Sequence, residues 1–124
     1  MEAVRVLREG ELINLSPEGT RNRTQELLLS FKYGAVILAM KTKAPIIPYA
    51  ITGDYRLFSG NLKIMYGEPF EVSGMKLYEA NKELYQRIMD LMITTMDPES
   101  LKQKHITTYD EWCALEKEKN NRFG

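Results

Sequence analysis

The hydrophobic and polar positions of the chain divide its first half into short apolar segments separated by polar loops. Residues 12–15 form an apolar run that leads into a loop with a proline and a glycine, which predicts a short buried strand over residues 11–15. Residues 28–42 are apolar on nearly every side, which predicts a helix buried on most of its surface. Residues 46–52 predict a second strand, in which Pro48 indicates an edge or a break. Strand, helix and strand in this order predict a right-handed parallel crossover.

The segments on either side of this unit have patterns of their own. Residues 3–8 predict the last turns of a helix, which Gly10 closes as a C-cap. Residues 55–58 form a weak segment after a turn, and residues 62–66 alternate as a strand. From residue 77 to about residue 95, apolar positions recur on one helical face and charged positions lie off it, which predicts a long amphipathic helix.

The elements together predict an α/β fold: a partial sheet with a strand–helix–strand crossover, followed by C-terminal helices. We expect residues 1–97 to form the C-terminal part of an α/β domain and residues 98–124 to form a charged helical tail. Asp97 and Pro98 mark the boundary, because they suit the N-cap and first position of a new helix.

Length and composition exclude several classes of protein. The chain has 124 residues, which is enough for one domain with a core but small for a complete α/β enzyme. Lys+Arg 17 against Asp+Glu 17 gives a formal net charge of +0, so we expect no nucleic-acid partner. The single cysteine excludes an internal disulfide, and no apolar run approaches the roughly 20 residues that span a bilayer. We therefore expect a soluble, cytoplasmic chain.

The loop after the first predicted strand carries the candidate chemistry. Its sequence is Ser16-Pro17-Glu18-Gly19-Thr20-Arg21. A loop at the end of a buried strand is a common place for an α/β domain to bind an anion. Arg21 offers a planar fork of donors suited to phosphate, and Glu18 can hold an arginine or the loop in shape. The residues alone leave open a plain surface turn with a salt bridge.

Three blocks follow one another along the chain in a specific order. They are Pro17-Glu18-Gly19-Thr20-Arg21, Phe31-Lys32-Tyr33-Gly34-Ala35 and Ala44-Pro45-Ile46-Ile47-Pro48-Tyr49-Ala50-Ile51. They resemble the Pro-Glu-Gly-Thr-Arg, Phe-Lys-x-Gly-Ala and Ala-Pro-Ile-x-Pro-Val blocks of the glycerolipid acyltransferases, the lysophosphatidic acid acyltransferase family. The resemblance covers roughly residues 3–72.

The resemblance implies a partial glycerolipid-acyltransferase-like sheet and a role in phospholipid biosynthesis. The implied reaction transfers an acyl group from acyl-CoA or acyl carrier protein to 1-acylglycerol-3-phosphate, without a metal or a further cofactor. The implied phosphate ligand is Arg21, and residues 45–48 would wall the site or the acyl channel. A full-length parent would make peripheral membrane contact. The implied substrate-binding residues are Glu18, Gly19, Thr20, Arg21, Arg23, Lys32 and Pro48.

The general base that the resemblance implies is missing from its expected place. In the family, a histidine and an aspartate separated by four residues lie upstream of the Pro-Glu-Gly-Thr-Arg block and activate the acceptor hydroxyl. Here 16 residues precede Pro17, and none of them is histidine. His105 and Asp110 have this spacing, but they follow the blocks, and Thr108 with Glu111 forms a capping-box pattern that explains it. We expect the chain to bind weakly alone and to be catalytically incomplete.

A second class of function stays open at this point. The chain can instead be a free-standing, non-enzymatic module that binds a phosphorylated ligand or a partner protein. Its sheet edge would then be covered within the chain or by self-association, because an open edge favours pairing with another strand.

Overall fold

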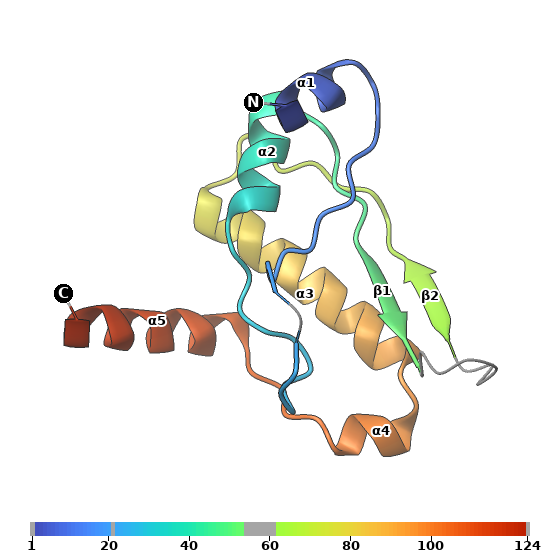
Figure 1. The fold of residues 1–124 in the computed structure, drawn as a ribbon, viewed down its shortest axis with the longest axis vertical. Coiled ribbons are helices and arrows are strands. Elements are labelled where there is room, and N and C mark those ends of the chain that lie inside the picture. Colours follow the sequence, from blue (N-terminus) through green and yellow to red (C-terminus); the bar gives the residue numbers. More distant parts are fainter. Residues whose placement is uncertain (1, 21, 54–61, 124) are drawn as a thin grey trace.

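In the computed structural model, the described residues are 2–20, 22–53 and 62–123, and they form five α-helices and two β-strands (Figure 1). Side chains are described as far as residue 120. The turn and weak segment predicted over residues 54–61 lie outside the described residues. The elements are α1 (Glu2–Arg8), α2 (Gly34–Thr42), β1 (Tyr49–Thr52), β2 (Lys63–Tyr66), α3 (Leu77–Thr95), α4 (Pro98–Lys102) and α5 (Tyr109–Phe123).

Helix α3 is the element on which the rest of the core packs. Its bounds confirm the amphipathic helix predicted over residues 77–95. It contacts both strands, α2 and the start of α5 (Figure 1). Burial of large apolar side chains contributes about 1.5–3 kcal/mol each, so this one face supplies a large part of the core. Its buried residues are Ala80, Asn81, Leu84, Tyr85, Ile88 and Met89, which meet Leu27, Leu28, Phe31, Val36, Val72 and Tyr109.

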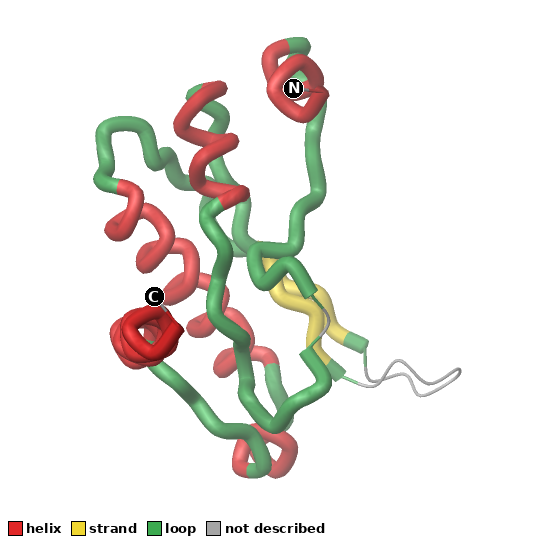
Figure 2. The backbone as a smooth tube through the Cα atoms, turned by 60° about the vertical axis from the view of Figure 1, so that its left-hand side comes forward, coloured by secondary structure: helices red, strands yellow, loops and turns green. Residues whose placement is uncertain are grey.

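The two strands form a small antiparallel sheet. Tyr49 lies opposite Tyr66, with ring centroids 5.7 Å apart. Ala50 and Thr52 on β1 are buried, whereas every residue of β2 is exposed. One face of β1 therefore packs on the core, and β2 presents apolar side chains to solvent. Figure 2 shows the two strands on one side of the molecule and α5 on another.

The segment over residues 11–15 is not a strand in this structure, contrary to the prediction. It pairs with no described strand, and Leu12 is 88% exposed. An apolar run becomes a strand only where a neighbouring ladder satisfies its amides and carbonyls, and no described residues supply that ladder here. The strand–helix–strand crossover is therefore not confirmed, and the sheet found is antiparallel.

The helix predicted over residues 28–42 begins later, at Gly34. The preceding residues use their amides outside a helical ladder: the Leu29 amide donates to the Glu18 carboxylate at 2.8 Å, and the Lys32 amide donates to the Pro17 carbonyl at 2.8 Å. A helix needs these donors for its own carbonyls. Contacts with the earlier loop therefore replace the first helical turns.

Several predicted helix ends are confirmed. Helix α1 ends before Gly10, which has φ +85°. The Asp97 carboxylate caps α4 by accepting from the Ser100 amide at 3.2 Å. The Glu111 amide donates to the Thr108 hydroxyl at 3.2 Å at the start of α5. No helix among the described residues combines the length and apolarity needed to cross a membrane.

Candidate functional site

The loop at Ser16–Thr20 forms a tight turn that depends on glycine. The Gly19 amide donates to the Ser16 carbonyl at 3.1 Å, and Gly19 has φ +71°. This left-handed conformation is costly for residues with a Cβ atom. The backbone conformation of this turn therefore explains why the first block has a glycine at position 19.

Glu18 holds this loop against the segment that leads into α2. Its carboxylate oxygen Oε2 accepts a hydrogen bond from the Leu29 amide at 2.8 Å. Burial raises the pKa of the Glu18 carboxyl above its usual value, and the bond from Leu29 partly opposes this shift. The carboxylate thus joins two sequence segments that lie eleven residues apart.

Lys32, from the second block, lies directly against the first block. Its amide donates to the Pro17 carbonyl, and its side chain passes over Gly19, where an added Cβ would lie 2.9 Å from the Lys32 Cδ atom. Glu18, Thr20 and Lys32 line a cavity of about 480 Å³. The structure therefore brings together four of the predicted site residues: Glu18, Gly19, Thr20 and Lys32.

The charges around this cavity are mixed. Its described lining contains one cation, Lys32, and two carboxylates, Glu18 and Glu116. Both carboxylates already accept hydrogen bonds, Glu18 from Leu29 and Glu116 from the Ser30 hydroxyl at 2.7 Å. A phosphate here would still need a further positive group, because a single ammonium does not outweigh two carboxylates.

Two arginines, Arg21 and Arg23, follow Gly19 along the chain. Arg21, the predicted phosphate ligand, lies outside the described residues. Arg23 is exposed and lines neither this cavity nor the larger one described below.

A second, larger cavity of about 660 Å³ runs beside the first and is mainly apolar. Glu18 lines both cavities, and Pro48 of the third block is buried in the wall of the larger one. Thr52 also lines it; its hydroxyl is buried and has no hydrogen-bond partner among the described residues. Its apolar wall includes Leu28, Phe31, Leu38, Ile46 and Ile88. Residues of all three sequence blocks thus line the larger cavity.

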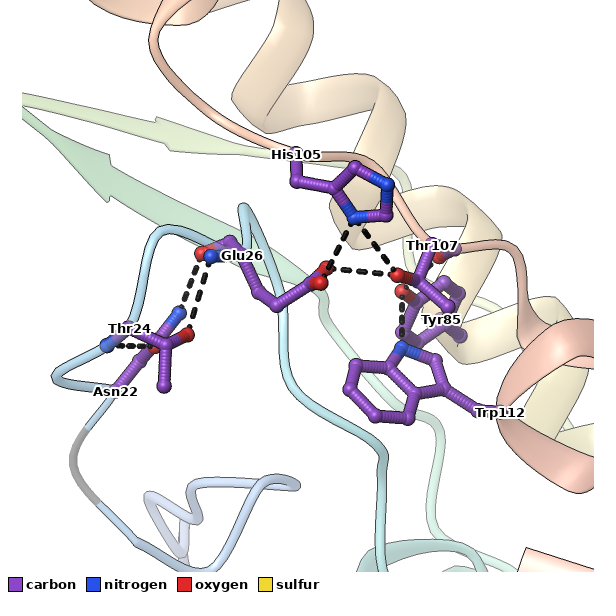
Figure 3. A network of polar contacts seen from close by, with 7 residues as sticks. All are labelled: Asn22, Thr24, Glu26, Tyr85, His105, Thr107 and Trp112. Carbon is purple, nitrogen blue, oxygen red and sulfur yellow. Dashed lines mark hydrogen bonds and ion pairs between the residues drawn. The ribbon is translucent and has the colours of Figure 1, made fainter. Parts of the chain in front are cut away.

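His105 and Asp110 do not form a pair. The His105 Nδ1 atom lies 2.8 Å from the Glu26 Oε1 atom (Figure 3), whereas Asp110 accepts from Tyr78 and, at 3.0 Å, from Lys82. Asp110 lies in the first turn of α5, which Thr108 caps, as the capping-box interpretation predicts.

Trp112 and Glu116 of α5 reach the smaller cavity, which the sequence analysis missed. The bond between Ser30 and Glu116 spans 86 positions of the chain, and no local pattern indicates it. The described residues contain no group of three or more His, Cys, Asp or Glu side chains able to hold a metal ion.

Comparisons with known proteins place these blocks in a family. The model of the Acyltransferase family matches residues 1–52. A 1-acyl-sn-glycerol-3-phosphate acyltransferase of Bacillus subtilis (strain 168) is 32% identical over 99 residues, 71% of this chain and 48% of that protein. Enzymes of the same name from Borreliella burgdorferi (strain ATCC 35210 / DSM 4680 / CIP 102532 / B31) and Limnanthes douglasii are 37% and 47% identical over 62 and 55 residues. These two matches cover 50% and 44% of this chain, and 24% and 19% of the relatives.

No solved structure matches the chain. The chain spans about half the length, or less, of the curated relatives it matches. The family match over residues 1–52 and these relatives, together with the three blocks, support the assignment of the chain to the acyltransferase family, as part of the family's domain.

Proposed function

We propose that this chain carries the acceptor-phosphate site of an enzyme that acylates 1-acylglycerol-3-phosphate in phospholipid biosynthesis. The observation that supports this most is the contact of Lys32 with Gly19, which joins the first two blocks around one cavity. The names of the relatives support the acceptor class. The acyl donor would be a thioester, acyl-CoA or acyl carrier protein.

Each residue has a distinct part in this proposal. The Arg21 guanidinium binds the phosphate through a bidentate pair, and the Lys32 ammonium adds a second charge. The Thr20 hydroxyl, which lines the same cavity, donates to a phosphate oxygen. Gly19 lets the backbone approach closely, and Glu18 keeps the loop in place. Arg23 is a peripheral cation, and Pro48 belongs to the apolar wall that accommodates an acyl chain.

We further propose that the chain is catalytically incomplete by itself. It contains one histidine, and His105 is bonded to Glu26, whereas Asp110, the acid at the spacing of the family box, is bonded to Lys82. Residues 11–15 and the exposed β2 would pair with strands from outside this chain and so form a larger sheet. That sheet would contain the predicted strand–helix–strand crossover. The exposure of Leu12 (88%) and Tyr66 (68%) supports this view. In their absence the open edge would favour self-association, which sedimentation would reveal as a mass above one chain.

The test is a titration of the full chain with glycerol 3-phosphate, followed by the fluorescence of Trp112, the only tryptophan and a cavity residue. Arg21→Ala should weaken binding about 5- to 150-fold, equivalent to about 1–3 kcal/mol for a charge-assisted pair. Arg8→Ala, which removes an exposed arginine from α1, is the matched control and should change nothing. Equal affinities for Arg21→Ala and Arg8→Ala, or equal binding of uncharged glycerol, would contradict the proposal.

A further inference from the structure

Glu26 is the centre of a network that joins two distant parts of the chain. Its carboxylate oxygens contact His105 Nδ1 at 2.8 Å and accept from the Thr107 hydroxyl at 2.7 Å (Figure 3). The backbones pair as well: the Leu27 amide donates to the His105 carbonyl at 2.8 Å, and the His105 amide donates to the Gln25 carbonyl at 2.8 Å. Segment 25–27 is thus bonded to segment 105–107 by both main chain and side chains.

The same residue also closes the turn that follows the Pro-Glu-Gly-Thr-Arg block. The Asn22 side-chain amide donates to the Glu26 carbonyl at 2.7 Å, and its oxygen accepts from the Thr24 hydroxyl at 2.7 Å. The Thr24 hydroxyl in turn accepts from the Glu26 amide at 3.1 Å. Asn22 directly follows the block, so these bonds fix the point at which the chain leaves the candidate phosphate loop.

The far side of the network is anchored in the core. The Thr107 carbonyl accepts from the Tyr85 hydroxyl at 2.5 Å, and that hydroxyl accepts from Trp112 Nε1 at 3.0 Å. Tyr85 is 1% exposed and Thr107 is 4% exposed. Segment 105–107 is therefore anchored to the core at Thr107, whose partner Tyr85 belongs to the buried face of α3.

We propose that Glu26 is a positioning residue: held by Thr107 and His105, it fixes Asn22 and thereby the end of the phosphate-binding loop. The identity of the ligand, a phosphate, rests on the proposed function. The effect of Glu26 on the conformation of the loop does not. An ionised carboxylate accepts from both partners at once. A glutamine has a single acceptor oxygen, so it cannot accept from both partners through separate oxygens, and the paired contacts at position 26 would change.

The experiment compares Glu26→Gln, Thr107→Val and Thr107→Ser in the full chain. Glycerol 3-phosphate affinity is measured by Trp112 fluorescence, and hydrogen exchange is measured by mass spectrometry for peptides covering residues 16–24. Glu26→Gln and Thr107→Val should each weaken binding about fivefold or more and accelerate exchange over residues 16–24. Thr107→Ser keeps the hydroxyl, so its glycerol 3-phosphate affinity and its exchange over residues 16–24 should match those of wild type. Thr94→Val is the matched control, because the Thr94 hydroxyl donates to the Asp90 carbonyl of its own helix.

The outcomes separate this inference from the proposed function. If the wild-type chain does not bind glycerol 3-phosphate, the proposed function fails, and exchange over residues 16–24 still decides the role of Glu26. If Thr107→Val accelerates exchange over residues 103–109 but leaves residues 16–24 unchanged, Glu26 is a local tie and the inference is overturned. Exchange over residues 16–24 that is as fast in Thr107→Ser as in Thr107→Val would also overturn the inference.

Discussion

Gly19→Ala tests whether the loop conformation and the placement of Lys32 depend on each other. Gly19 has φ +71°, and the left-handed region costs a residue with a Cβ atom about 1–2 kcal/mol. The new Cβ would also lie 2.9 Å from the Lys32 Cδ atom and 3.1 Å from its Cε atom. The lysine side chain is flexible and can move away, so this contact adds little to the stability cost. It does displace the ammonium from the cavity.

Gly74→Ala is the matched control for backbone strain. Gly74 has φ +85°, and a Cβ built there has no neighbour within 4 Å. Both variants should lose about 1–2 kcal/mol of unfolding free energy, measured in urea by Trp112 fluorescence. Only Gly19→Ala should also weaken glycerol 3-phosphate binding under conditions where both variants are folded. The reasoning is refuted if Gly19→Ala has the same free energy of unfolding as wild type, or if the two variants bind glycerol 3-phosphate with equal affinity.

Three other predictions concern groups with defined partners. Burial raises the pKa of the Glu18 carboxyl, so the contribution of this group to the free energy of unfolding is fully present below the usual glutamate pKa. That contribution is lost as pH rises through the pKa of the folded state. Urea unfolding across this pH range should show the loss in wild type but not in Glu18→Gln. Burial raises the pKa of Tyr85 to about 12, so its stabilising contribution is present below pH 10 and is lost as pH approaches 12. The tyrosinate absorbance of wild type minus Tyr85→Phe should therefore show one late-titrating group, and titration near pH 10 would contradict burial of this hydroxyl. Asp97→Ala removes the acceptor for the Ser100 amide and should cost about 1 kcal/mol of unfolding free energy, whereas an unchanged urea midpoint would show that this cap contributes nothing.

Local patterns predicted the elements whose causes are local. The amphipathic period of α3 specified a helix with the observed bounds, and Asp97 and Thr108 predicted helix starts because their side chains cap amides three residues ahead. The segment over residues 11–15 was predicted as a strand because it is apolar, but a strand also requires a partner.

The parts that sequence reasoning missed depend on contacts between distant residues. The late start of α2 follows from the bond between Glu18 and Leu29, which no helical periodicity reveals. The pairing of Glu26 with His105 spans 79 positions, and that of Ser30 with Glu116 spans 86. Within the site, Glu18 bonds to the segment before Lys32, and the Lys32 side chain lies against Gly19, as the structure shows. The blocks gave no indication that α5 supplies part of the cavity wall.

Amide chemical-shift changes in ¹⁵N-labelled full chain, titrated with glycerol 3-phosphate, test the proposed phosphate site most directly. We expect the shifts to concentrate in residues 16–23 and 31–33 and to be lost in Arg21→Ala. Shifts that concentrate elsewhere, or that persist unchanged in Arg21→Ala, would contradict a phosphate site at this loop.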